Sequence, residues 1–207
     1  SCQLVHVEDE LSVKYEVAAF LKAFDGGKAV YFDMVEGFSN PVVGGVCGTR
    51  ERICQAINVE KSDFHARLDH AMRNPEKARV VSDGPVKDVL EKPKLSRIPI
   101  LTHYEGDPTP YITSAIVYAQ SPDGEIRNAS IHRLQALDDG KLAIRIVPRH
   151  LYQLCQLAKE KGRKTLDVSI SIGLHPALLL ASSSPAPYGT CEFDVANSLL
   201  KGGLNLV

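Results

Sequence analysis

The first 95 residues contain apolar side chains at helical spacing, interrupted by glycine and proline. One series runs from Leu11 to Phe24 and ends at Gly26-Gly27. Another ends at Pro75, because proline cannot continue a helix. We therefore predict helices at 9–24, 49–58 and 60–73, a strand at 29–32 and a Gly-, Ser- and Pro-rich loop at 37–48.

From residue 96 the pattern changes to short runs of β-branched and apolar residues that are typical of strands. The turns Pro122-Asp-Gly124 and Asp138-Asp-Gly140 favour antiparallel hairpins. We predict strands at 98–101, 111–119, 127–134, 142–147, 168–173 and 203–207. Helices are predicted at 150–161, at 176–182 and after Thr190, which is a plausible N-cap. The sequence thus predicts an α+β protein, with an α/β part to residue 95 and a mainly antiparallel β-domain with peripheral helices.

Composition narrows the class of protein. The net charge of −1 over 207 residues gives no basic field for nucleic acid. No apolar run reaches membrane-spanning length, and the N-terminus does not have the pattern of a signal peptide. The five cysteines are widely spaced, which favours reduced thiols in a cytoplasmic protein over a zinc site. They are Cys2, Cys47, Cys54, Cys155 and Cys191.

Polar and charged side chains are concentrated between Asn128 and His150, within predicted β-structure. Charge inside a sheet is costly unless it is paired or serves a ligand. Arg133 and Arg145, on neighbouring predicted strands, are suited to clamp a phosphate or carboxylate. Arg149 and His150 begin a predicted helix, whose N-terminus favours an anion. The sequence therefore indicates a site for an anionic ligand.

Each of these residues also has an explanation without function. Asn128 follows a turn, where asparagine is common, and the arginines fit exposed strand edges. Glu192 is expected near a helix N-terminus for reasons of the helix dipole alone. Asn128 and Arg133 are five residues apart, so a regular strand would point them to opposite faces. Either a bulge intervenes, or the two side chains reach different parts of a ligand.

Several motifs in order resemble the UbiD family of decarboxylases. The resemblance is clear over 96–207, and the N-terminal part is compatible with it. It implies an N-terminal α/β domain at 1–95 and an antiparallel split β-barrel that binds flavin at 96–207. The motifs are Ile98-Pro-Ile-Leu-Thr-His-Tyr-Glu-Gly-Asp107, Pro110-Tyr-Ile-Thr113, Arg127-Asn-Ala-Ser-Ile-His-Arg133, Ile172-Gly-Leu-His-Pro-Ala-Leu-Leu-Leu-Ala181, Pro185-Ala-Pro187 and Glu192.

The resemblance also implies cofactors and site residues. Prenylated FMN, Mn²⁺ (or Mg²⁺) and K⁺ are the family's cofactors. The metal positions fall on Asn128, His150 and Glu192, and the arginine that partners the substrate carboxylate falls on Arg133. Apart from the resemblance, the sequence offers His103 and Glu105 as weaker candidates that would approach a ligand from a loop. The flavin contacts fall on Ile131, His132, Arg133, Arg145, Ile146, Val147, Arg149 and His150.

The implied activity is reversible, non-oxidative decarboxylation of an aromatic or α,β-unsaturated acid. Two departures, His175 and Ala196-Asn-Ser-Leu199, argue against a routine ubiquinone-pathway enzyme. We therefore favour anhydromevalonate phosphate in isoprenoid synthesis over a polyprenyl-hydroxybenzoate in quinone synthesis. A non-catalytic flavin-binding module or subunit stays open as an alternative of a different class.

The resemblance carries expectations about the rest of the protein and its partners. The family's catalytic acid and C-terminal domain would lie beyond Val207, so we expect a fragment of a longer enzyme. The expected partners are a small carboxylic acid substrate, the missing C-terminal portion, further copies in a homo-oligomer and a prenyltransferase that supplies the modified flavin. No nucleic-acid partner and no membrane span are expected.

Overall fold

The computed structural model describes residues 4–207 of the chain, so Cys2 lies outside the described residues. The residues divide into two compact units, each assembled from three separate segments. The predicted boundary at residue 95 stays a prediction, since each unit includes residues on both sides of it. The first unit contains the residues up to Ile53, Glu91–Thr113 and Arg133–Ile144, and the second contains Cys54–Leu90, Ser114–His132 and Arg145–Val207.

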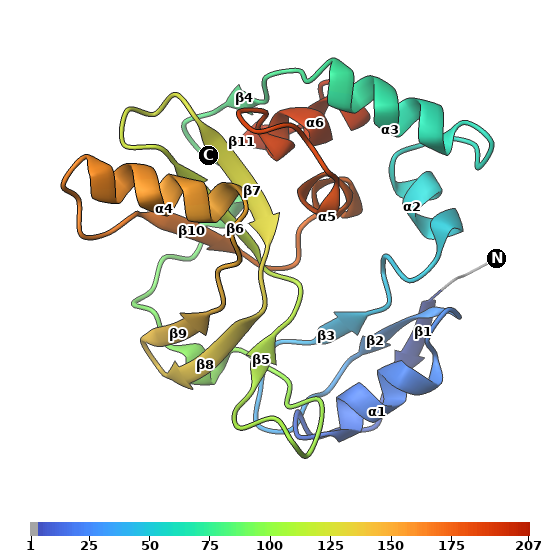
Figure 1. Ribbon diagram of the computed structural model, residues 1–207. Helices are drawn as coiled ribbons and strands as arrows, with labels where there is room; N and C mark the ends of the chain where they lie inside the picture. Colours follow the sequence, from blue (N-terminus) through green and yellow to red (C-terminus); the bar gives the residue numbers. More distant parts are fainter. Residues whose placement is uncertain (1–3) are drawn as a thin grey trace. The chain divides into compact units, whose positions relative to one another are not determined.

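A three-stranded sheet and one helix form the core of the first unit (Figure 1). The strands are β1 (Leu4–Val7), β2 (Ala29–Phe32) and β3 (Val42–Gly44), with β1 parallel and β3 antiparallel to β2. Helix α1 (Glu16–Ala23) contributes Val17, which is fully buried with Val30 and Phe32. Strand β2 thus supplies Val30 and Phe32, which lie two residues apart and point to the same face of the sheet.

Two predictions for this unit are wrong in part. Residues 9–15 are not helical, because Leu11 and Lys14 form bridges with Val35 and Thr102. Tyr15, at φ 74°, turns the chain into α1. The predicted loop 37–48 contains β3, which the edge of β2 recruits by hydrogen bonding. The strand at 29–32 is confirmed.

The first unit also contains an antiparallel sheet in the order β5-β8-β9. These strands are β5 (Tyr111–Ile112), β8 (Leu134–Asp138) and β9 (Lys141–Ile144), and the predicted hairpin at Asp138–Gly140 is confirmed. The predicted strand at 98–101 is not formed. These residues follow the short 3-10 helix η2 (Leu95–Arg97) and do not belong to any of the described strands. A second 3-10 helix, η1 (Pro85–Lys87), belongs to the second unit.

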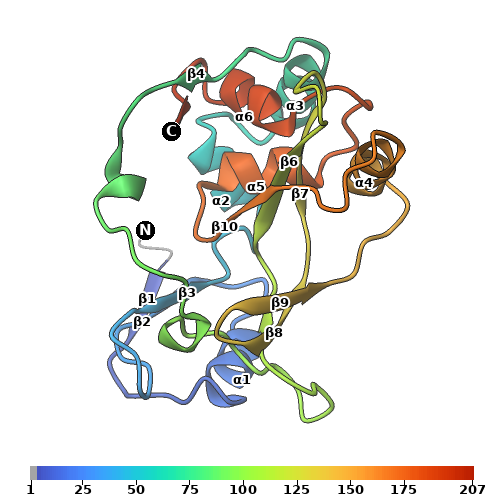
Figure 2. The ribbon, with the colours of Figure 1, turned by 90° about the vertical axis from the view of Figure 1, so that its left-hand side faces the viewer.

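The second unit is built around the antiparallel sheet β10-β6-β7. Its strands are β6 (Ile116–Gln120), β7 (Arg127–Ile131) and β10 (Val168–Ser171). Figures 1 and 2 show α4 (His150–Glu160) on one side of this sheet, with α5 (Pro176–Ser183) and α6 (Glu192–Leu199) on the other. Strand β7 therefore has helices against both of its faces, α4 on one and α5 and α6 on the other.

The remaining elements of the second unit pack around α6. Helix α3 (Phe64–Arg73) contacts α6, and β4 (Arg79–Val80) pairs in parallel with β11 (Asn205–Leu206). Helix α2 (Arg50–Ala56) spans the division between the units. Among residues 4–207, no helix combines the length and the apolar character needed to cross a membrane. The four described cysteines, Cys47, Cys54, Cys155 and Cys191, are free thiols.

Five predicted strands are interrupted or shorter than expected. Of 168–173 and 203–207, only Val168–Ser171 and Asn205–Leu206 are strands. The stretch 111–119 contains two strands, β5 and β6, and the stretch 127–134 divides into β7 and β8. The predicted strand 142–147 ends at Ile144, because the chain turns there toward α4. Helix α6 begins at Glu192 with Cys191 as its N-cap, so Thr190 is not the cap. The described sheets have open edges, and none of them closes into a barrel.

Candidate functional site

The first turn of α6 places the carboxylate of Glu192 against β7. The residue is 3% exposed, and a buried carboxylate is costly without hydrogen-bond donors. Two donors come from β7: the Ala129 backbone N–H lies 2.7 Å from Oε2, and the Asn128 side-chain nitrogen lies 2.8 Å from Oε1. The structure therefore joins two predicted metal positions that are 64 residues apart.

The third predicted position, His150, begins α4 and reaches the same carboxylate. Its Nδ1 lies 3.7 Å from Glu192 Oε1, and its ring meets the Tyr188 ring edge-on at 5.4 Å between centroids. Burial raises the pKa of Glu192 above its usual value, against the opposing effects of the hydrogen bonds from β7 and of His150. Asn128 and His150 thus lie beside a buried carboxylate whose cost of burial they offset only in part.

This donor set fits a divalent cation. A carboxylate, a carboxamide oxygen and an imidazole are ligands that Mn²⁺ accepts, and Mg²⁺ shares the oxygen donors. A cation would also offset the buried charge of Glu192. The Asn128 amide directs its nitrogen at Glu192, and half a turn of the amide presents its oxygen instead. Within the described part of the chain, no three His, Cys, Asp or Glu side chains form a metal cluster, so a site here depends on the asparagine.

The residues predicted to contact flavin lie on two short connections. His132 and Arg133 link β7 to β8, and Ile131 is the last residue of β7. Arg145, Ile146, Val147 and Arg149 lie between β9 and α4 and are exposed, with His150 next in the chain. The prediction that Arg133 and Arg145 lie on neighbouring strands of a hairpin is wrong. Each arginine lies one residue beyond the last pair of the β8–β9 ladder, Leu134 and Ile144.

The five-residue spacing between Asn128 and Arg133 is explained by the end of a strand. Strand β7 stops at Ile131, so alternation of side chains does not extend to Arg133. Arg133 belongs to the first unit, where its guanidinium lies 5.5 Å from the centroid of the Tyr111 ring. His103 and Glu105 lie in a turn of that unit, which is held by hydrogen bonds from the backbone of His103 and Tyr104 to Asp107.

Residues that sequence reasoning missed surround the three predicted metal positions. Ser130 donates a hydrogen bond to Asn128 Oδ1 at 2.9 Å and lies 3.0 Å from His132 Nε2. Arg127 pairs with Asp194 at 2.5 Å, with both side chains largely buried. The alternation Asn128, Ser130, His132 along one strand face was the available signal for the first group. No local pattern links Arg127 to Asp194.

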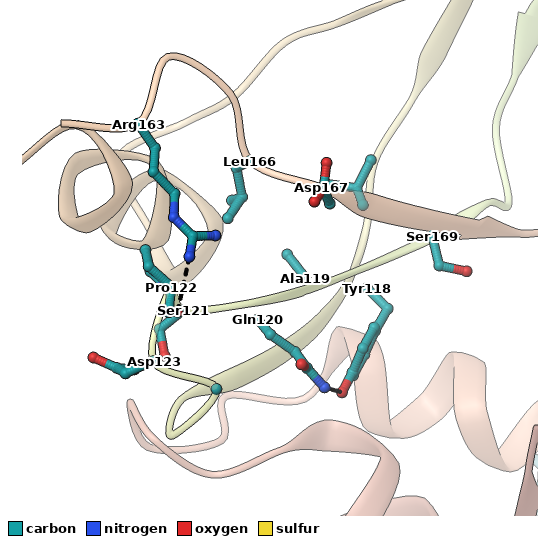
Figure 3. A pocket seen from close by; sticks show the side chains of 12 residues that line it. Tyr118, Ala119, Gln120, Ser121, Pro122, Asp123, Arg163, Leu166, Asp167 and Ser169 are labelled. Carbon is teal, nitrogen blue, oxygen red and sulfur yellow. Dashed lines mark hydrogen bonds between the residues drawn. The ribbon is translucent and has the colours of Figure 1, made fainter. Parts of the chain in front are cut away.

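A separate hollow of about 610 Å³ lies where β6 ends and turns toward β7 (Figure 3). In it, Arg163 donates to the Pro122 carbonyl oxygen at 3.2 Å, and the Gln120 amide donates to the Tyr118 hydroxyl at 2.6 Å. None of the predicted metal or flavin residues lines it, so it is distinct from the cluster around Glu192.

Comparison with protein families identifies the class of this chain. The UbiD family model, described as the 3-octaprenyl-4-hydroxybenzoate carboxy-lyase Rift-related domain, matches residues 78–207. The model for the N-terminal domain of the same carboxy-lyase matches residues 2–72. The chain therefore belongs to the UbiD family.

Individual relatives agree with this assignment. The chain is 40% identical over 202 residues to an anhydromevalonate phosphate decarboxylase of Methanothermobacter thermautotrophicus, covering 97% of this chain and 47% of that protein. It is 30% identical over 197 residues to a gallate decarboxylase of Lactiplantibacillus plantarum, covering 87% and 40%. The chain thus spans about half the length of the curated relatives it matches.

A solved structure shows the same fold. The UbiD-class enzyme HmfF from Pelotomaculum thermopropionicum, in complex with FMN, matches with a TM-score of 0.94 and 40% identity. The match covers 99% of this chain and 47% of HmfF.

Proposed function

We propose that this chain is the cofactor-binding portion of a UbiD-type decarboxylase that uses prenylated FMN. The observation that carries the proposal is the meeting of Asn128, His150 and Glu192 around one buried carboxylate. Two structures of HmfF, one with FMN and one with prenylated FMN, support the choice of cofactor. We also propose an α/β domain over 1–95 and a split barrel over 96–207. The α+β fold, with its two antiparallel sheets, is compatible with both.

The proposed metal site holds Mn²⁺ or Mg²⁺ through Asn128, His150 and Glu192. A cation there neutralises Glu192 and supplies positive charge for a phosphate. Arg149, the N-cap of α4, adds charge beside free backbone N–H groups, which suits the same phosphate. Potassium belongs to the proposal through the family resemblance alone, and we assign no side chain to it.

The remaining site residues serve the flavin ring and the substrate. The exposed apolar side chains of Ile146 and Val147 provide surface for a planar ring, with Ile131, His132 and Arg145 as further contacts. Arg133 orients the substrate carboxylate, because a guanidinium can donate two parallel hydrogen bonds to it. Prenylated flavin, when bound, supplies the electron sink that loss of CO₂ requires.

The proposed substrate is anhydromevalonate phosphate, in isoprenoid synthesis. Its support is that relatives of that name from several archaea match the chain, at up to 40% identity. The gallate decarboxylase is more distant, at 30%. A polyprenyl-hydroxybenzoate is therefore the less favoured substrate. A non-catalytic module is also less favoured, because the matched relatives carry the names of decarboxylases.

Other parts of the proposal concern the complete protein. We propose that it acts as a homo-oligomer in the cytoplasm, with a prenyltransferase as the source of its modified flavin. One HmfF structure is of an evolved dimeric form, which supports self-association. A catalytic acid that protonates the product completes the proposed site.

Flavin titration tests the cofactor assignment. We expect the purified chain to bind FMN in the presence of MnCl₂, seen as quenching of flavin fluorescence, and Asn128→Ala to weaken this binding. A wild-type chain that leaves flavin fluorescence unchanged at all Mn²⁺ concentrations would overturn the assignment.

Turnover tests the role of Arg133. In the complete gene product loaded with prenylated FMN, Arg133→Ala should lower kcat/KM for CO₂ release by about a hundredfold, because the carboxylate loses its orienting partner. Arg73→Ala, in an exposed pair on α3, is the control and should keep wild-type rates. Full activity of Arg133→Ala would contradict its role in orienting the substrate carboxylate. If the wild-type enzyme releases CO₂ from gallate but not from anhydromevalonate phosphate, the proposed substrate is wrong.

A further inference from the structure

Three polar side chains lie in a row on one face of β7 and the residue beyond its end. The Ser130 hydroxyl oxygen lies 2.9 Å from Asn128 Oδ1 and 3.0 Å from His132 Nε2. At the other end of the row, Asn128 Nδ2 lies 2.8 Å from Glu192 Oε1. Close polar contacts therefore link His132 to the carboxylate.

The single proton of the Ser130 hydroxyl limits this row to two arrangements. In the first, Ser130 donates to Asn128 Oδ1, and the amide nitrogen donates to Glu192. In the second, Ser130 donates to His132 Nε2 and accepts from the amide nitrogen, so the amide oxygen faces Glu192. Two oxygen atoms facing each other at that distance repel unless a cation lies between them. The second arrangement therefore suits a bound cation, and the first suits its absence.

His132 determines which arrangement is available. Its ring is partly buried, and burial lowers its pKa below the usual value of 6.5. A hydrogen bond with the Arg145 backbone acts in the opposite direction, as expected when the ring is the donor to a carbonyl. In the neutral ring, donation from one nitrogen leaves the other as an acceptor. Since Nε2 faces Ser130, the neutral ring can accept the hydroxyl proton there.

We propose that Ser130 and His132 are positioning residues that turn the amide of Asn128 toward a divalent cation. Neutral His132 accepts the Ser130 proton, Ser130 accepts the Asn128 N–H, and the amide oxygen is released to the cation. Neither residue ligates the cation itself. The inference rests on the metal site of the proposed function and extends it from the ligands to the groups that orient them, which commonly tune metal affinity.

Mn²⁺ affinity of the flavin-free chain, measured by the EPR signal of free Mn²⁺, tests the proposal. Ser130→Ala should weaken binding by about 10- to 100-fold, the usual range for such orienting groups. Ser130→Thr retains a hydroxyl and should rescue the affinity. His132→Phe removes the acceptor and should weaken binding as Ser130→Ala does. Ser169→Ala, on the exposed face of β10, is the matched control and should bind like wild type.

NMR of the Asn128 side-chain amide supplies a readout that does not depend on activity. Its resonances, identified by their loss in Asn128→Asp, should move on Ser130→Ala in the metal-free chain and on addition of Mg²⁺ to wild type. The positioning role of Ser130 and His132 is overturned if Ser130→Ala leaves the chemical shifts of the Asn128 amide unchanged, or if this variant binds Mn²⁺ with wild-type affinity. A wild-type chain that binds no Mn²⁺ overturns the proposed metal site. The metal-free NMR spectra of wild type and Ser130→Ala then show separately whether Ser130 orients the Asn128 amide.

Discussion

At the scale of single residues, the site is organised by the burial of one carboxylate. Glu192 is 3% exposed, and its direct partners are a backbone N–H, a carboxamide and an imidazole. The hydrogen bonds from β7 and the effect of His150 lower the cost of this charge only in part, so burial is the dominant influence on the pKa of Glu192. Such an arrangement is expected where a cation completes the balance of charge.

The pH dependence of stability should reveal this carboxylate. Because the folded-state pKa of Glu192 lies above its usual 4.5, the folded chain binds the proton more tightly than the unfolded chain. The free energy of unfolding therefore falls as the pH rises from the unfolded through the folded pKa. Glu192→Gln removes this titration, so the free energy of unfolding of the metal-free variant should not fall over this pH window.

Urea denaturation in EDTA on both sides of this pH window measures the effect. Glu125→Gln, in the exposed turn after β6, is the control and should follow the wild-type pH profile. The same pH profile in Glu192→Gln and wild type would show that the pKa of Glu192 does not differ between the folded and unfolded chain.

At the scale of elements, the first turn of α6 is fixed by three consecutive side chains. Glu192 bonds to β7, Phe193 stacks on Tyr118 of β6 with 5.4 Å between ring centroids, and Asp194 pairs with Arg127. Asp194 also accepts a hydrogen bond from the Ala78 backbone at 3.3 Å. The helix is thereby held in one register against the sheet, which places Glu192 opposite Asn128.

The Asp194–Arg127 pair should matter more than an exposed ion pair. Asp194→Ala leaves the partly buried Arg127 without its partner and should lower the free energy of unfolding by about 3 kcal/mol. Asp69→Ala breaks the exposed pair with Arg73 on α3 and should cost less than about 0.5 kcal/mol. Urea denaturation of the two variants gives both values, and equal losses would rule out the fixing role of Asp194.

At the scale of the whole molecule, the chain passes back and forth between its two units. Each unit is assembled from three segments, so neither is a continuous stretch of sequence. Each also has its own apolar core, with Phe32 fully buried in the first and Leu154 in the second. The backbone connects the two units repeatedly. If one unit unfolds, the other must therefore hold together the ends of long disordered loops, which costs conformational entropy.

We therefore expect the chain to unfold in one cooperative transition. Phe32→Ala and Leu154→Ala remove core side chains and should each cost about 2–5 kcal/mol. Both variants should shift a single urea transition, followed by circular dichroism, to lower concentration. Hydrogen exchange supplies the independent check: a variant in which exchange rises in one unit while the other keeps its protection would contradict coupled unfolding.

The sequence by itself determined the class of fold and the set of candidate site residues. Alternation and turn residues located the hairpins at Asp123-Gly124 and Asp139-Gly140, because these signals are local. The resemblance to the UbiD family, carried by ordered motifs, points to Asn128, His150 and Glu192 without information on their proximity. Strand ends were less certain, since the breaks at His132 and after Ile144 depend on where neighbouring strands offer partners.

Only the tertiary structure decided which side chains act together. Glu192 resembled an ordinary residue of a first helical turn until the fold placed it against β7. The pairing of Arg127 with Asp194 and the row from His132 to Glu192 join residues whose separation along the chain carries no signal. Hydrogen bonds act over about 3 Å, whereas sequence patterns report only the local backbone, so such contacts appear only when the chain is folded.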